Sequence, residues 1–251
     1  MSLLAHTRPR STTEIIDWSF RFYRAHWGDL AVLSALLLVP PALLTVVTPA
    51  WFHTVIQVTE NLMFLVVQGA IAVFVSAAIE GDQVISAAET LRRLGGRAGS
   101  VLGAAILSGI LIMIGAFVLL VPGIIILVWT AVATPAAAVE QARTFRALAR
   151  SRDLARGHFW HVLGTVIFAW IIMIVLAFGA GITLEIILEL IGVPAVITDS
   201  LQALLFVALF PLVGVAVTLL YYDLRVRNEG ADLVAMMEAL PELQRDVGRG
   251  A

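Results

Sequence analysis

An uncharged stretch in the middle of the chain limits what this sequence can fold into. Residues 98–139 comprise 42 side chains, and none of them is charged. A helix needs about 20 apolar residues to cross the hydrocarbon of a bilayer, so one straight helix would be twice too long. Pro122 and Gly123 lie near the middle, where proline interrupts helical hydrogen bonding and glycine permits a sharp reversal. The stretch therefore predicts two membrane-spanning helices, about 99–121 and 124–141, that reverse at Pro122-Gly123.

The composition agrees with a membrane protein. The 251 residues are 60% hydrophobic and 14% charged, whereas soluble domains carry about 25% charged residues. The net charge of −2 gives no reason to expect a nucleic-acid partner. The 251 residues include no cysteine, which excludes disulfides, thiolate metal sites and thiol nucleophiles from this sequence.

Six apolar segments in total have the composition of membrane spans. Besides the two central ones, they are residues 30–47, 61–78, 160–179 and 201–221, and a short segment at 183–191 is either interfacial or part of a span. With both termini inside, all 16 arginines lie in the inner segments. Arginine is retained on the cytoplasmic side of a membrane. We therefore predict an all-α, multi-pass membrane protein with six transmembrane helices and both termini in the cytoplasm.

An arginine-bearing amphipathic segment precedes each pair of spans. The first, residues 11–27, opens with Ser11 and Glu14 at capping-box spacing. It is either a helix in the membrane interface or a polar-faced extension of the first span. Similar segments occupy residues 84–94 and 141–157. The pattern predicts three hairpins, each preceded by an amphipathic interfacial helix.

The repeat divides the chain into units. We expect a six-span membrane domain at 1–228 followed by a short cytoplasmic tail at 229–251. The membrane domain then comprises units 11–82, 83–140 and 141–225. Short sequence echoes between the units are compatible with internal duplication, but apolar helices also match by chance, and the sequence leaves this open.

A polar signature closes the last span. It consists of Tyr222, Asp223, Arg225, Arg227, Glu229 and Gly230. An aromatic residue followed by arginines is typical of the cytoplasmic end of a span, with the charges in solvent. Because acids flank the arginines, ion pairs within the signature or with other inner helices are the alternative interpretation.

This signature resembles that of a bacterial family, the membrane domain found N-terminal to some glycerophosphoryl diester phosphodiesterases and also as stand-alone proteins. The other matching positions are Asp17, Tyr23, Arg24, Pro122, Gly123, Glu140, Arg150 and Ser151. The resemblance implies a helical membrane domain of the bacterial cytoplasmic (inner) membrane whose own molecular role is poorly defined. It does not imply the phosphodiesterase, which needs a soluble barrel of more than about 200 residues. No soluble segment here exceeds about 30 residues once the predicted spans are subtracted, and the His-Arg-Gly sequence that opens that catalytic domain is absent.

Few residues suit catalysis or metal binding, so we predict no enzyme, cofactor or metal site. His158 and His161 are three residues apart and could share a metal, but no carboxylate at matching spacing accompanies them. We interpret them as interfacial histidines. Glu185 and Glu189 are paired carboxylates that we expect to face water, and no phosphate-binding loop sequence is present.

The spans contain few polar side chains, and none of the candidates is ionised. The candidates are Gln68, Ser76, Ser108, Thr130, Thr134 and Thr165. Polar residues inside spans mark transport pathways, and the lack of ionisable ones disfavours ion-coupled transport. Helices interrupted by proline could nevertheless line a cavity.

Three functions are compatible with the sequence. The favoured one is a non-enzymatic membrane protein that contacts lipids, including anionic headgroups at the arginine belt, or a membrane-protein partner. The second is a lipid or small-molecule transporter, or a transporter subunit, with a cavity between the hairpins. The third is a membrane-embedded enzyme using Glu140 and Asp223. A cavity between repeats favours transport, whereas Glu140–Arg150 or Asp223–arginine contacts without a cavity favour a scaffold.

Overall fold

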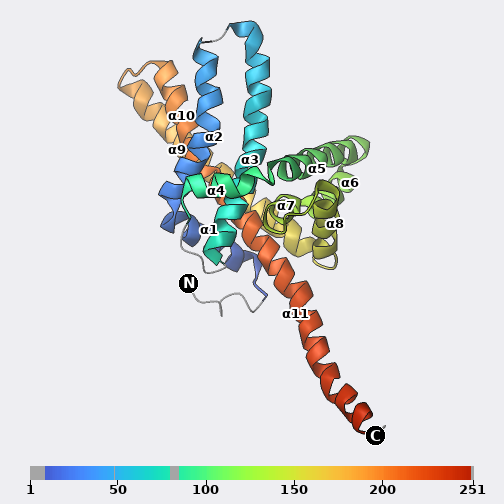
Figure 1. Ribbon diagram of the computed structural model, residues 1–251. Helices are drawn as coiled ribbons and strands as arrows, with labels where there is room; N and C mark the ends of the chain where they lie inside the picture. The colour runs from blue at the N-terminus through green and yellow to red at the C-terminus, as the bar shows by residue number, and fades with distance from the viewer. Residues whose placement is uncertain (1–8, 48, 80–84, 250–251) are drawn as a thin grey trace.

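The computed structural model describes residues 9–47, 49–79 and 85–249 (Figure 1). These ranges contain helices and no strand: α1 (Thr12–Ala25), α2 (Trp27–Val47), the 3-10 turn Ala50–Phe52, α3 (His53–Ile79), α4 (Ala87–Gly95), α5 (Ala98–Val118), α6 (Leu120–Thr130), α7 (Ala133–Val139), α8 (Thr144–Ala155), α9 (Phe159–Leu190), α10 (Ala195–Leu209) and α11 (Pro211–Arg249). The all-α prediction is therefore confirmed for the described residues. The predicted boundary between the first two units, at 82 and 83, lies outside them.

Within the part of the chain that the structure describes, five stretches of helix are long and apolar enough to cross a membrane. They are Thr54–Ile79, Ala98–Val118, Leu120–Val139, Phe159–Leu190 and Ile197–Gly230. The chain is thus a multi-pass helical membrane protein. The first predicted span corresponds to α2, whose described apolar part, Trp27–Pro41, is shorter than the other five. Pro40 and Pro41 lie inside α2 without ending it.

The three amphipathic helices occur where the sequence predicts them. Helix α1 begins at Ser11 with a complete capping box, in which the Ser11 hydroxyl accepts from the Glu14 amide and the Glu14 carboxylate accepts from the Ser11 amide. Helix α4 begins at Ser86, whose hydroxyl accepts from the Glu89 amide. Helix α8 ends before Gly157, which has a positive φ of 77° as expected for a glycine after a helix end.

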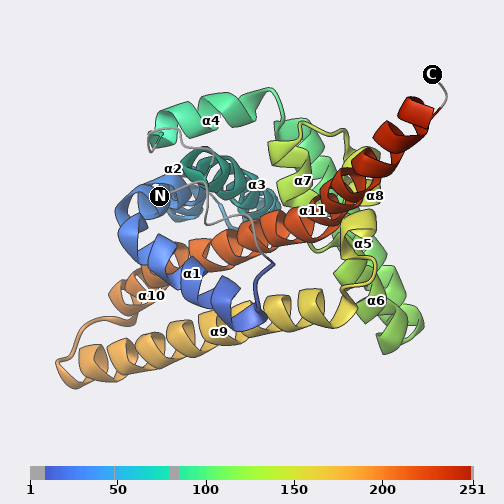
Figure 2. The ribbon, with the colours of Figure 1, turned by 90° about the horizontal axis from the view of Figure 1, so that it is seen from below.

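Each amphipathic helix packs against the second hairpin helix of a neighbouring unit. Helix α4 contacts α3, and α8 contacts both α6 and α7. Helix α1 contacts α11, so the first unit closes a ring with the third. Figure 2 shows α1 lying along α11 and beside α9 at this closure. The same kind of contact, an amphipathic helix on an apolar helix of the preceding or closing hairpin, therefore occurs at α4, α8 and α1.

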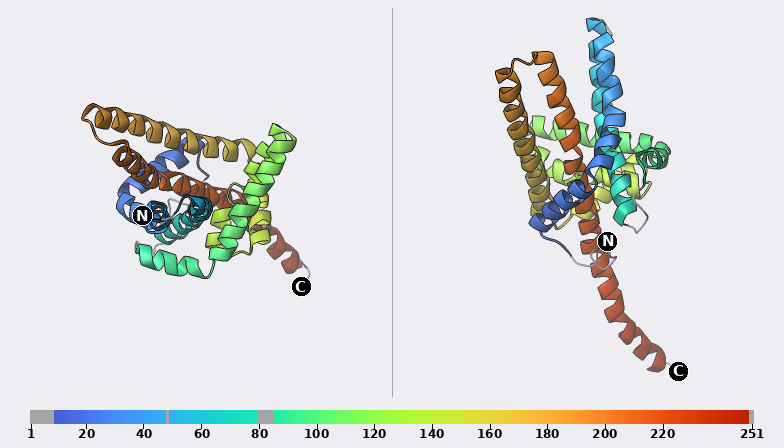
Figure 3. Two further views of the ribbon diagram at one scale, coloured as in Figure 1. Left: turned by 90° about the horizontal axis from the view of Figure 1, so that it is seen from above. Right: turned by 90° about the vertical axis from the view of Figure 1, so that its left-hand side faces the viewer.

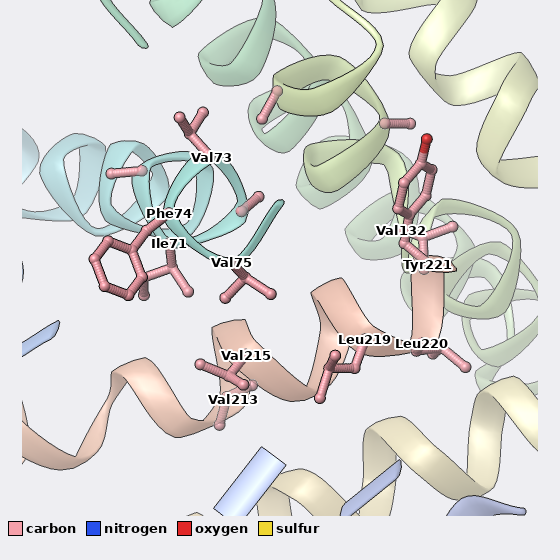
Figure 4. Packing of buried hydrophobic residues seen from close by; sticks show 14 of the residues in the cluster. Ile71, Val73, Phe74, Val75, Val132, Val213, Val215, Leu219, Leu220 and Tyr221 are labelled. Carbon is pink, nitrogen blue, oxygen red and sulfur yellow. The ribbon is translucent and has the colours of Figure 1, made fainter. Parts of the chain in front are cut away.

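Helices α3 and α11 form the centre of the molecule. Figure 4 shows side chains of α3, including Ile71 and Val75, facing Val215 and Leu219 of α11, all of them buried. Apolar surface gains little from leaving lipid, so close packing rather than the hydrophobic effect holds such helices together. Gly214 permits this approach, because a Cβ at this position would lie 2.9 Å from the Ile71 side chain.

The third hairpin differs from its predicted form. Residues 183–191 belong to the single 32-residue helix α9 up to Leu190, and the reversal follows at Gly192, whose φ is 76°. The predicted sixth span is interrupted at Phe210, because α10 ends at Leu209 and α11 begins with Pro211. Helix α11 then continues through the predicted tail, with no break between residues 228 and 229.

The central stretch reverses at a different residue from the one predicted. Helix α5 ends at Val118 and α6 begins at Leu120, so Leu119, in an extended conformation, forms the turn. Pro122 instead lies in the first turn of α6, where a missing N–H costs nothing. The placement of the turn at Pro122-Gly123 is therefore wrong. The predicted span at 124–141 is also interrupted, since α6 ends at Thr130 and α7 begins at Ala133.

The hairpin of α5 and α6 runs across the direction of the other two hairpins. Figures 1 and 3 show α2–α3 and α9–α10 extending to the same end of the molecule, while α5–α6 projects sideways. The break between α6 and α7 permits this, because α7 returns to pack on α3 while α6 stays with α5. The tip is apolar and exposed, with Phe117 at 91% and Leu120 at 71% of their full accessible area.

Single cysteines can test this arrangement, because the sequence contains no cysteine of its own. We expect Trp51→Cys and Val193→Cys, at the ends of the other two hairpins, to react with a membrane-impermeant maleimide. Leu119→Cys should react slowly in both intact and permeabilised membranes, because an exposed apolar tip is placed in hydrocarbon. Fast labelling of Leu119→Cys from the same side as Val193→Cys would show instead that α5–α6 crosses the bilayer.

Candidate functional site

The charged signature lies on one segment of α11, residues 221–229, at the end of the bundle that carries the start of α1, helix α8 and the start of α9. We call this the basic end. Side chains spaced four apart share a helix face. Asp223 and Arg227 form one face, and Tyr221, Arg225 and Glu229 form another. The two faces contact different parts of the chain, so α11 connects several helices at the basic end.

Asp223 is the centre of the first polar cluster. Its side chain is only 2% exposed. The carboxylate accepts from Arg227 Nε at 2.7 Å and from the Arg10 amide at 2.6 Å, and it lies 2.9 Å from His161 Nε2. A buried carboxylate requires such partners, because its desolvation is otherwise prohibitive. The cluster joins α11 to α9 and to the segment before α1.

The other nitrogen of His161 is also engaged. His161 Nδ1 lies 3.3 Å from the Thr12 hydroxyl, at the start of α1, and Thr165 donates to Thr12 at 3.3 Å. An Asp–His pair is a common acid–base arrangement. Here both ring nitrogens and the carboxylate are already hydrogen-bonded within the chain, and neither residue lines either of the cavities described below. The pair therefore links α9 to α11 and to the start of α1.

A second cluster connects α11 to α7 and α8. Glu140, directly after α7, accepts from the Tyr221 hydroxyl at 2.7 Å and from Arg150 Nε at 2.9 Å. Arg150 also donates to Glu229, which accepts in turn from Arg225 at 3.1 Å. The guanidinium of Arg150 therefore bridges two carboxylates from different elements, as its planar fork of donors allows.

Two predicted signature positions satisfy the backbone at helix breaks. The Ser151 hydroxyl of α8 is buried and accepts from the Val132 amide, in the break between α6 and α7, at 3.2 Å. The Tyr23 hydroxyl of α1 donates to the Ala208 carbonyl, near the break between α10 and α11, at 2.8 Å. Burial raises the pKa of the Tyr23 phenol, which keeps it protonated and able to donate. In lipid such backbone groups need an internal partner.

The remaining signature positions do not join these clusters. Asp17 and Arg24 lie on the exposed side of α1, where Asp17 pairs with Arg21 at 2.7 Å. Pro122 and Gly123 lie at the distant α5–α6 tip. Two others follow on α11 itself: the ring of Tyr222 lies edge-on to that of Tyr221 at 5.2 Å, and no atom lies within 4 Å of a Cβ built at Gly230.

Several residues that form contacts at the basic end were not predicted from the sequence. Arg10 contributes its amide to Asp223, and its guanidinium lies 3.9 Å from the Trp18 ring. Asn228 donates to the Leu154 carbonyl at 3.1 Å. His161 was expected to be an ordinary interfacial histidine, yet it faces Asp223, while His158 bonds to the Arg156 carbonyl. The one signal in the sequence for these contacts was Asp223 itself, because a charged side chain in an apolar helix requires polar partners.

Much of the arginine belt is paired within the chain. On α4, hydrogen bonds from Arg92 and Arg93 lower the pKa of Glu89 from 4.5 to about 2, so this acid stays ionised at neutral pH. Arg143 and Arg146 differ, because they are exposed and the described residues offer them no hydrogen bond or ion pair. With Arg24, which is also exposed and has no hydrogen bond or ion pair to the described residues, these two are available for the predicted contact with anionic headgroups.

A cavity of about 400 Å³ lies between the three units, and we call it the central cavity. Five polar side chains line it: Gln68 of α3, Ser108 of α5, Thr130 of α6, Thr134 of α7 and Thr218 of α11. Four of these five were among the candidate polar residues within spans. A second cavity, of about 420 Å³, lies between α9 and α10 and shares Trp170 with the first.

No cluster of three or more histidine, aspartate or glutamate side chains that could hold a metal occurs among residues 9–47, 49–79 and 85–249. At the far end of α9, Glu185 is exposed and lies 3.2 Å from Gln202 Nε2. Comparisons with protein-family models, with curated proteins and with solved structures found no match to this chain. The two polar clusters and the central cavity are the features of this chain that bear on its function.

Proposed function

We propose that this chain is a non-enzymatic polytopic protein of the bacterial cytoplasmic membrane, with both termini in the cytoplasm, that works by contacting lipids or a membrane-protein partner. The observation that carries the proposal is the bonding of Asp223. Its carboxylate is 2% exposed, interacts with His161, Arg227 and the Arg10 amide of its own chain, and lines neither the central cavity nor the cavity between α9 and α10. Glu140, the other acid considered for catalysis, is bonded to Tyr221 and Arg150.

We further propose membership of the membrane-domain family that the signature resembles. The support is the spatial convergence of signature residues from distant parts of the sequence. Arg150 pairs with both Glu140 and Glu229, and Asp223 pairs with Arg227.

Extraction in a membrane-scaffolding polymer, followed by mass spectrometry of lipids and proteins, tests the function. We expect a lipid class enriched several-fold over the bulk membrane, or a protein recovered at a constant ratio to this chain. Incubation with glycerophosphodiesters should release no glycerol phosphate above the level of an unrelated multi-pass protein purified in the same way. Release that disappears in Asp223→Asn, or recovery of neither lipid nor partner, contradicts the proposal.

The central cavity favours a second candidate, a lipid or small-molecule transporter or a subunit of one. It lies between the repeats, where inverted or repeated units of transporters place their sites. Uptake into vesicles distinguishes the two candidates, because a carrier moves its ligand across the bilayer and a lipid-contacting scaffold does not.

A further inference from the structure

The cavity between α9 and α10 opens on the outer surface of the third hairpin, and we call it the α9–α10 groove. It has a volume of about 420 Å³, and most of its lining is apolar or aromatic. Part of the lining is itself exposed, with Phe178 at 65% and Ile182 at 52% of their full accessible area. Both helices belong to stretches that are apolar enough to cross a membrane, so these side chains face lipid. A molecule that occupies the groove therefore comes from the bilayer.

The groove is as long as one leaflet of a bilayer is deep. Its lining on α9 runs from Trp170 to Glu185, which is about 22 Å at 1.5 Å per residue. Half of a bilayer, headgroups included, is about 20–22 Å thick. Glu185 lies 24 positions, or about 36 Å, beyond His161 of the basic end on the same helix. Figure 3 shows α9 continuing from the basic end to the hairpin turn beside α10. The groove therefore extends from the opposite membrane interface toward the middle of the bilayer.

The volume of the groove suits an acyl chain better than a helix of a partner protein. A helix is about 10 Å across and would occupy about 1,700 Å³ over the same length, roughly four times the volume of the groove. An acyl chain is a single file of methylene groups. Ligand sites of about 300–1,000 Å³ typically combine an apolar lining with a few polar groups that orient the ligand.

The polar group is at the interfacial end of the groove. Glu185 lines the groove and is exposed, so a bound molecule can reach its carboxylate. Gln202 of α10 lines the groove as well, and its Nε2 donates to Glu185 Oε2 at 3.2 Å. An ionised carboxylate has about four acceptor positions. Glu185 therefore has the capacity to accept from a bound molecule in addition to Gln202.

The charge around Glu185 favours a cation. Residues 159–209 contain three acidic side chains, Glu185, Glu189 and Asp199, and no arginine or lysine. All three are exposed. This end of the hairpin therefore attracts positive groups of the headgroup layer and repels negative ones. A second copy of the chain inserted in the same direction presents the same acidic end, and a metal ion would leave the apolar groove unfilled.

We propose that the α9–α10 groove binds a phospholipid whose headgroup ends in a primary amine. The ammonium group donates to the Glu185 carboxylate, and one acyl chain lies along the groove toward Trp170. The proposal rests on the proposed function, since it names the lipid class that this membrane protein contacts and the place of contact. The apolar length and the carboxylate at its interfacial end are both required, because together they match the two parts of one lipid.

Photolabelling in lipid nanodiscs tests the position of the acyl chain. Phosphatidylethanolamine with a diazirine at the end of one chain should crosslink to peptides that contain Trp170 or Met173, which line the inner part of the groove. Gly181→Leu should lower this labelling at least about tenfold. Gly181 lines the groove, and no atom lies within 4 Å of a Cβ built there, so the leucine side chain enters the free space.

Gly179→Leu is the matched control for the blocking variant. Gly179 lies on the same helix and also has no atom within 4 Å of its built Cβ, but it does not line the groove. This variant should label like the wild type. Both substitutions replace a glycine inside a helix with a stronger helix former, so both proteins should unfold at or above the Tm of the wild type.

Competition tests the headgroup. Unlabelled phosphatidylethanolamine should displace the probe about fivefold more effectively than phosphatidylglycerol with the same chains, because only the first carries an amine. Glu185→Gln should abolish this preference. Glu189→Gln should retain it, because Glu189 lies one turn further along α9 and outside the groove.

Two results would overturn the proposal. Equal labelling of the Gly181→Leu and Gly179→Leu proteins would show that the chain does not lie in the groove. Equal displacement by the two lipids, or a preference that persists in Glu185→Gln, would show that Glu185 does not select an amine. If either occurs while polymer extraction still recovers an enriched lipid or partner, the site is wrong and the proposed function stands.

Discussion

Replacing Asp223 with asparagine is expected to destabilise the protein by about 3 kcal/mol, because it breaks a buried charge pair and leaves the partner uncompensated. Arg227 is 22% exposed and directs its guanidinium at this carboxylate and at the Arg10 carbonyl. Loss of the carboxylate therefore weakens the links of α11 to α9 and to the segment before α1. For a chain of this size the loss corresponds to a fall of about 6–12 °C in Tm. Thermal unfolding of the purified protein in detergent measures it.

The matched control for Asp223→Asn is Asp17→Asn. Asp17 also pairs with an arginine four residues away, Arg21, but the two side chains are 56% and 73% exposed. Such a surface pair contributes about 0.2–1 kcal/mol. The two variants remove the same charge from pairs of the same spacing, so the difference between them measures the burial of Asp223 together with its bonds to His161 and the Arg10 amide. Similar Tm values for both variants would show that the Asp223 cluster does not hold the basic end together.

The elements of this fold were predictable because their determinants are local in the sequence. Apolar length predicts the long helices, and the spacing of Ser11 and Glu14 predicts the start of α1. Arginines that recur at helical spacing predict α4 and α8. These patterns involve residues within a few turns of one another, which a single sequence displays. The repeated order of one amphipathic helix and two apolar helices follows from them.

The partners within the clusters were not predictable from the sequence alone. His161 and Asp223 are 62 positions apart, and their contact depends on how α9 and α11 are rotated about their axes. The same rotations decide which polar residues meet: Ser108 and Thr134 line the central cavity, whereas Ser76 bonds to its own helix at the Val73 carbonyl. Hydropathy indicates that these residues lie at membrane depth but does not indicate which neighbour they face.

The crosswise hairpin was not predictable for a related reason. The apolar stretch 98–139 has the composition of two spans, and composition does not distinguish a helix that crosses the bilayer from one that lies within it. The direction depends on the breaks at Leu119 and at Ala131–Val132, which are set by packing on α3 and α8. Pro122-Gly123 lies in the predicted hairpin, three residues after the observed turn at Leu119. Its role there is close packing of α6 on α5.

Replacing Gly123 with alanine should destabilise this hairpin, by about 1–3 kcal/mol, because the added methyl group cannot be accommodated without a backbone shift. A Cβ at Gly123 would lie 2.8 Å from both Cα and N of Ala116, and these backbone atoms cannot rotate away as a side chain can. Tight glycine contacts of this kind let membrane helices approach closely. Thermal unfolding in the same detergent reports the loss, as does faster proteolysis at the α5–α6 tip.

Gly109→Ala provides the opposite expectation in the same hairpin. Gly109 lies in the middle of α5 with no atom within 4 Å of its built Cβ. Alanine is about 0.5–1 kcal/mol more favourable than glycine inside a helix, so this variant should be neutral or more stable than the wild type. The two substitutions add the same methyl group and remove the same backbone freedom, so their difference measures the contact between Gly123 and Ala116 alone. Equal effects of the two would mean that α6 does not pack against α5 at this point, and the one-residue turn at Leu119 would then be wrong as well.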